Sequence, residues 1–195
     1  GGDTIRFDPR YRRAYVYGNV LVKLEEDSNS QMIHYGGDSG DESAYRKGTL
    51  FLYNNTLVSR RSSTTLVRLS TNSEHLDCRN NILFTTHAGS SLAILDEKGT
   101  AALSYNWKAA HSSSFGNVNS EAEIHSGDNP GFQDVAKNLF FLTAKSACLN
   151  KAGPLPAAVQ NNFPVVQQFK GPRGIEKRPA ASLKDLGALE RVSEE

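Results

Sequence analysis

Alternating apolar and polar residues recur in two consecutive copies of one pattern between Gly48 and Leu95. The first copy comprises residues 48–58 and 65–69, and the second comprises residues 75–84 and 91–95. Each copy has an alternating segment, a pair of asparagines, a short apolar continuation, a turn and a second apolar segment. Alternation with a period of two is typical of strands that bury one face. The pattern therefore predicts that each copy folds into short β-strands.

Fainter copies flank this pair, at residues 15–22 with 31–35 before it and at residues 101–107 after it. An asparagine recurs at the same place in every copy, and these corner residues are Asn19, Asn55, Asn81 and Asn106. We expect them to tolerate the left-handed backbone of a bend and to form a ladder in which each amide bonds the next. The last two intervals match one coil of a β-solenoid. We expect an all-β chain with parallel solenoid coils over residues 1–110. Residues 111–195 are expected to form a loop, capping strands and a tail packed on those coils as part of one domain.

The alternation also predicts which side chains share a face. Aligning the copies on the corner asparagine directs Leu52 and Cys78 inward. It leaves two outward rows, which are Tyr17, Tyr53 and Arg79 in one and Tyr15, Phe51 and Asp77 in the other. The aromatic part of these rows has two interpretations. It is either a platform on which sugar rings stack, or an apolar patch that the tail covers.

Composition narrows the function classes. The formal net charge is +1, which gives no reason to expect nucleic acid as a partner, and no apolar run is long enough to span a membrane. Two cysteines are too few for a disulfide framework. Cys78 is expected to act as a small buried hydrophobe, and a bridge between Cys78 and Cys148 stays open. No capping segment precedes Tyr15, so we expect the chain to continue an upstream β-helix portion, in the same or a separate polypeptide.

Motifs in the C-terminal part resemble a known signature. They are Asn129-Pro-Gly-Phe132, Asn138-Leu-Phe-Phe-Leu142, Ser146-Ala-Cys-Leu-Asn-Lys-Ala-Gly153 and Asp185-Leu-Gly-Ala-Leu-Glu190. Together they resemble the C-terminal end of secreted right-handed parallel β-helix proteins, which include polysaccharide lyases of the pectate lyase and chondroitinase B-like kinds. The sequence departs from that signature at Cys148 and at Leu189. The resemblance implies a right-handed parallel β-helix, an extracellular or periplasmic location and an acidic polysaccharide as partner.

The segment 34–47 interrupts the repeats and is rich in groups that support chemistry. A lyase of uronate-containing glycans needs a cation that neutralises the carboxylate, a base and an acid. The residues of the required types are His34, Arg46, Lys47 and Arg68, and we predict these four as catalytic. If Ile33 and Tyr35 point inward with Val67 and Leu69, His34 and Arg68 point outward on adjacent coils. The predicted substrate-binding residues are Tyr35, Tyr17, Tyr53 and Arg79. The predicted ligands of a bridging Ca²⁺ are Asp38, Asp41 and Glu42.

Two alternatives remain beside the lyase. The first is a non-catalytic β-solenoid that binds glycan or serves as a surface, spike or filament component. A glycoside hydrolase that uses a pair of the loop carboxylates is the second. An enzyme is expected to gather His34, Arg46, Lys47 and Arg68 in one exposed cleft. A structural module is expected to scatter them or to pair them internally.

Overall fold

The computed structural model describes residues 8–37, 40–41, 45–87, 91–96, 98–112, 116–171, 174–179 and 185–191. The described chain is almost entirely β, with a single short helix, α2 (Ala157–Gln160). Its strands pair mainly in parallel, so the predicted all-β fold with parallel pairing is confirmed.

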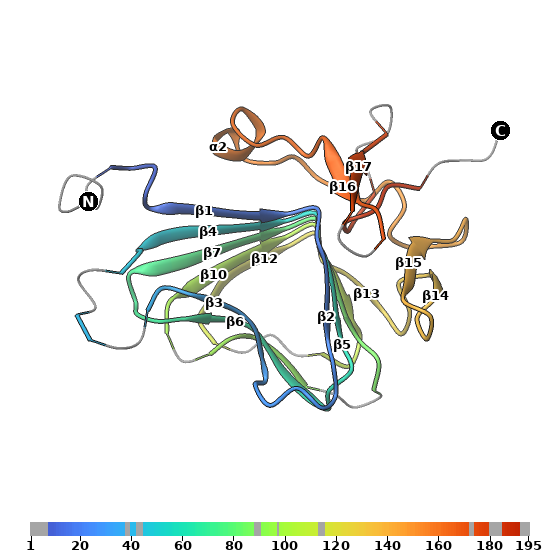
Figure 1. Ribbon diagram of the computed structural model, residues 1–195, viewed down its shortest axis with the longest axis horizontal. Helices are drawn as coiled ribbons and strands as arrows, with labels where there is room; N and C mark the ends of the chain where they lie inside the picture. The colour runs from blue at the N-terminus through green and yellow to red at the C-terminus, as the bar shows by residue number, and fades with distance from the viewer. Residues whose placement is uncertain are drawn as a thin grey trace.

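Three parallel sheets form the body of the molecule, and the chain visits them in turn (Figure 1). The first sheet contains β1 (Arg13–Tyr17), β4 (Gly48–Tyr53), β7 (Glu74–Arg79), β10 (Thr100–Ser104) and β12 (Val118–Ala122). The second contains β2 (Val20–Lys23), β5 (Thr56–Ser59), β8 (Ile82–Thr85), β11 (Trp107–Ala109) and β13 (His125–Gly127). The third contains β3 (Gln31–Tyr35), β6 (Ser63–Leu69) and β9 (Ser91–Leu95). Because β12 and β13 extend two of these sheets, the parallel stack continues past residue 110, the predicted boundary.

The sheets enclose one apolar interior, to which all three contribute. Leu52, Cys78 and Leu103 lie side by side on adjacent strands of the first sheet and are almost completely buried. Leu57 from the second sheet and Val67 from the third face the same interior. The predicted register is therefore confirmed, because inward residues of successive passes stack in rows.

The corner between the first two sheets is built from pairs of residues with separate roles. The first residue of a pair has a left-handed backbone, as at Asn54 with φ of 51° and Asn80 with φ of 57°. The second belongs to a ladder in which each side chain accepts hydrogen bonds from the previous one. Asn55 donates to Asn81, and Asn81 donates to Asn106, from both the backbone N–H and the side-chain amide. The predicted asparagine ladder is present, but the left-handed position precedes it by one residue.

The C-terminal part packs against the outside of the sheets (Figure 1). It contains the antiparallel pair β14 (Phe132–Asp134) and β15 (Leu139–Leu142), the helix α2, and the antiparallel pair β16 (Gln167–Phe169) and β17 (Ile175–Lys177). Apolar residues of β14, β15 and the 186–189 segment cover the outer face of the second sheet. Val159 and Val165 cover aromatic residues on the outer face of the first sheet.

Both cysteines are buried and free, so no disulfide joins them. Burial raises the pKa of the Cys78 thiol to about 12, and it does the same for Cys148. A thiol reacts through its thiolate. Both side chains are therefore inert at neutral pH and act as small apolar groups, as the sequence predicted for Cys78.

Candidate functional site

Charged and polar side chains cross the outer face of the third sheet in one row. His34 on β3 lies opposite Arg68 on β6, and Asp96 directly follows β9. Val67 pairs with Leu95, which places Arg68 beside Asp96. Their inward neighbours Val67 and Leu69 are buried, so alternation directs the row outward. This His34–Arg68–Asp96 row matches the predicted adjacency of His34 and Arg68, and it adds a residue that we had not predicted.

Asp96 sets the electrostatics of the row. Its Oδ2 lies 3.9 Å from Arg68 Nε, and both side chains are 38 % exposed. Gln31 Nε2 lies 3.5 Å from the same oxygen. Exposed ion pairs at this separation are weak, so Arg68 can exchange its carboxylate partner at little cost. Asp96 was not predicted, and its place in the same outward row as His34 and Arg68 is the sequence signal that could have identified it.

One ring nitrogen of His34 contacts Ser70, and the other has no hydrogen-bond partner among the residues that the structure describes. Its Nε2 lies 3.0 Å from Ser70 Oγ, and the Ser70 hydroxyl donates to the Tyr35 carbonyl at 3.3 Å. The tautomer of His34 sets which of Nε2 and Ser70 Oγ donates in this contact, and Nδ1 is the ring nitrogen that lies outside it. His34 is exposed, so it is placed to accept a proton from a ligand that lies along the row.

Lys47 is engaged in the fold. Its Nζ lies 3.4 Å from Glu74 Oε1 and 3.2 Å from Thr71 Oγ1. Glu74 is buried, and its other oxygen accepts hydrogen bonds from the Thr71 N–H and hydroxyl. A buried carboxylate without a cation is strongly unfavourable. Lys47 therefore neutralises Glu74 at the corner between the third and first sheets, and it lies near the His34 end of the row because Ser70 and Thr71 are consecutive.

Two further predicted residues have structural contacts. Arg46 is exposed, and its guanidinium carbon lies 4.8 Å from the centre of the Tyr11 ring. Tyr35 is buried in the interior, where its hydroxyl donates to the Lys47 carbonyl at 3.1 Å. Burial raises the pKa of Tyr35 to about 12. Tyr35 therefore offers neither a surface for sugar nor an acid that works near neutral pH.

The aromatic rows of the first sheet are stacked and covered. The Tyr17 and Tyr53 ring centres are 4.9 Å apart, and Phe163 of the tail lies 4.3 Å from Tyr15. Tyr53 is buried and donates its hydroxyl proton to the Phe163 carbonyl at 2.8 Å. Coverage by the tail is thus the interpretation that the structure supports for Tyr53. Arg79 is paired with Asp77, with 2.6 Å between Nε and Oδ1.

The predicted calcium ligands fall largely outside the described residues. Asp38 and Glu42 belong to that undescribed part, and Asp41 is exposed. Within the described ranges, no three His, Cys, Asp or Glu side chains converge on a metal position. Calcium binding by these carboxylates, like a hydrolase reaction that uses them, stays a prediction.

Comparisons with known proteins return no family model, no curated protein and no solved structure that matches this chain. The described part of the chain also contains no helix long and apolar enough to cross a membrane.

Proposed function

We propose that this chain is a right-handed parallel β-helix that binds acidic polysaccharide along its third sheet, through the His34–Arg68–Asp96 row. The observation that carries the proposal is the pairing of His34 with Arg68 on adjacent strands of an exposed face. Strands about 4.8 Å apart present a repeating row of side chains to an extended polymer. A uronate carboxylate would replace Asp96 as the partner of Arg68, with the charge-assisted bonds that arginine forms best.

Cleavage by β-elimination is the second candidate. His34 supplies a base with Nδ1 available, and Arg68 supplies a cation for the carboxylate. The leaving oxygen also needs a proton. Lys47 is held by Glu74, and Tyr35 is buried, so neither of these predicted residues supplies that proton readily. Binding therefore ranks above cleavage, with the non-catalytic solenoid favoured over the lyase. The resemblance of the tail motifs supports an extracellular or periplasmic location, which we propose together with this function.

Changing Arg68 to glutamine is expected to weaken binding to an acidic polysaccharide about tenfold, because one charge-assisted interaction is lost. Affinity electrophoresis in polygalacturonate and in a neutral glucan measures the effect. Lys137→Gln is the matched control, since it removes a cation from the exposed 134–137 turn on the C-terminal hairpin. No retardation by polygalacturonate, or equal loss in both variants, would refute the proposal. A rise in ultraviolet absorbance from unsaturated uronate that requires His34 would instead establish the lyase.

We also propose that another β-helix coil stacks against β1, β2 and β3. Interior-facing residues of β1 and β2 are only half-buried, as at Val16 and Leu21, whereas their counterparts Leu52 and Leu57 are fully buried. Asn19 begins the corner ladder, and within the described residues its Oδ1 accepts no hydrogen bond. An asparagine in the added coil would donate to that oxygen. At the opposite end of the stack, Lys108 of β11 takes the interior-facing position that Leu83 has on β8. Lys108 pairs there with Glu121 of β12, so charged groups lie at that end of the interior.

A chain extended upstream tests this docking edge. A copy of residues 48–73 joined to Arg12, in place of residues 1–11, keeps the observed register, in which Arg13 pairs with Thr49. The backbone N–H groups of β1–β3 that point to the open edge of each sheet are expected to exchange with solvent at least about tenfold more slowly than in the original chain. The same copy with proline in each strand cannot pair and serves as the control. Unchanged exchange with the intact copy would contradict the docking edge.

A further inference from the structure

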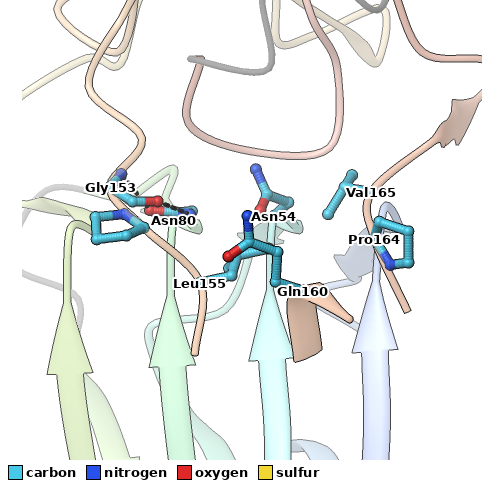
Figure 2. Close-up of a pocket in the computed structure, with 8 residues that line it drawn as sticks. Asn54, Asn80, Gly153, Leu155, Gln160, Pro164 and Val165 are labelled. Atoms are coloured by element: carbon cyan, nitrogen blue, oxygen red, sulfur yellow. Dashed lines mark hydrogen bonds between the residues drawn. The ribbon is translucent and has the colours of Figure 1, made fainter. Parts of the chain in front are cut away.

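A pocket of about 270 Å³ lies where the tail crosses the corner between the first and second sheets. Figure 2 shows Asn80 and Gly153 on one side of it, Pro164 and Val165 on the other, and Asn54 and Leu155 between them. Gln160 of α2 reaches toward Asn54 (Figure 2). The volume is slightly below that of sites for drug-sized ligands, so the pocket fits one small group.

Asn54 and Asn80 occupy equivalent positions in consecutive passes of the chain. Both have the left-handed backbone, and each donates its N–H to the carbonyl that ends the neighbouring strand, Arg79 or Ser104. Asn80 pairs its side-chain amide with one residue of the tail. Its Nδ2 donates to the Gly153 carbonyl at 3.0 Å, and its Oδ1 accepts from the Gly153 N–H at 2.9 Å. An asparagine at this position therefore binds the N–H and C=O of a single peptide residue.

Asn54 has the same side chain in the same setting, yet its amide has no hydrogen-bond partner among the residues that the structure describes. The residue is only 4 % exposed, and its amide lies in the pocket (Figure 2). The tail cannot repeat the Gly153 pair one position further along, because Pro154 has no N–H. Neither amide atom is among the fully buried polar atoms that lack a partner, so the amide is accessible through the pocket to a molecule that bonds it.

We propose that Asn54 binds one residue of an extended peptide from a partner, in the way that Asn80 binds Gly153. The N–H of the ligand residue donates to Asn54 Oδ1, and its carbonyl accepts from Nδ2. The side chain of the ligand residue is apolar, because Leu155, Val165 and Pro164 line the pocket and none of the described lining residues is charged. A sugar fits less well, since the described lining contains no aromatic ring on which it would stack. This site is separate from the His34–Arg68–Asp96 row.

The probe is N-acetyl-leucine N-methylamide, which presents the N–H, the C=O and the apolar side chain of one residue. Titration of the isotope-labelled chain is expected to shift the side-chain NH₂ signals of Asn54. The dissociation constant is expected to be about 1 mM, because the ligand is small. N-acetyl-proline N-methylamide is the matched control probe. It lacks the residue N–H and is expected to bind about tenfold more weakly.

Asn54→Gly is the matched variant, because glycine retains the left-handed backbone at φ of 51° while removing the amide. It is expected to weaken binding of the leucine probe about tenfold. Asn150→Gly is the control, because it makes the same change at an exposed left-handed residue that does not line the pocket, and it is expected to bind the leucine probe as tightly as the original chain. Three results would each overturn the proposal: no shift at Asn54, equal binding of the two probes, or a shift produced only by a neutral methyl glycoside.

Discussion

Replacing Arg178 with methionine is expected to lower the free energy of unfolding by about 3 to 5 kcal/mol, the cost of leaving one partner of a buried ion pair without its opposite charge. Arg178 and Glu190 are almost completely buried, with 2.8 Å between Nη2 and Oε2. The guanidinium also donates to the carbonyls of Asp185, Gly187 and Ala188. One arginine thus provides hydrogen bonds to three carbonyls of one turn, and its loss leaves these carbonyls and the Glu190 carboxylate without that partner.

That turn fixes the tail to the corner of the sheets. Gly187 donates its N–H to the Asn80 carbonyl, and Ala188 donates to the Thr56 hydroxyl. A Cβ at position 187 would lie 2.7 Å from Thr56 Oγ1, so glycine is required where the turn approaches the sheet. Loss of Arg178 is therefore expected to release the turn and expose the outer face of the second sheet.

Urea unfolding measures the change, and limited proteolysis follows release of the tail. Lys177→Met removes the neighbouring exposed cation and should change the free energy by less than about 0.5 kcal/mol. The double variant Arg178→Met with Glu190→Gln should be less destabilised than the single one, because no carboxylate is left buried without a cation. Equal stability of Arg178→Met and Lys177→Met would show that the buried pair does not hold the tail.

Regular repetition explains what the sequence could predict. The rows that contain Leu52 and Cys78, the Asn55–Asn81 ladder and the His34–Arg68 adjacency all follow from aligning one copy of the pattern with the next. In a parallel stack, equivalent residues lie on adjacent strands, so a register deduced from one row holds for the others. The prediction succeeds wherever contacts join equivalent positions.

Contacts between non-equivalent positions could not be predicted in this way. Lys47 reaches Glu74 through the geometry of two turns, and no spacing in the sequence indicates that pairing. Tail segments that follow no repeat cover Tyr53 and pair Asn80 with Gly153. The candidate site therefore divides in two. His34 and Arg68 follow from the repeat, whereas the engagement of Lys47 and Tyr35 in the fold depends on turns and long-range packing.

Replacing Asn81 with alanine is expected to lower the free energy of unfolding by about 2 to 6 kcal/mol, because two buried groups lose their partners at about 1 to 3 kcal/mol each. Asn81 is fully buried at the centre of the ladder. Its Oδ1 accepts from the Asn55 N–H at 2.9 Å, and its Nδ2 donates to the Leu52 carbonyl at 2.8 Å. Once the Asn81 side chain is removed, the Asn55 N–H and the Leu52 carbonyl lose these partners inside the fold, where water does not replace them.

The exposed end of the ladder, at Asn19, supplies the control for this prediction. Asn19 is exposed at the corner between the edge strands β1 and β2, so Asn19→Ala should cost less than about 1 kcal/mol when measured by the same urea unfolding. Asn81→Asp preserves the shape but cannot donate to Leu52, and it should be destabilised about as much as Asn81→Ala. If Asn81→Asp were close to the original chain, loss of volume rather than loss of hydrogen bonds would explain the alanine result. The ladder would then be a consequence of the stacking, and the apolar rows alone would hold the successive passes of the chain together.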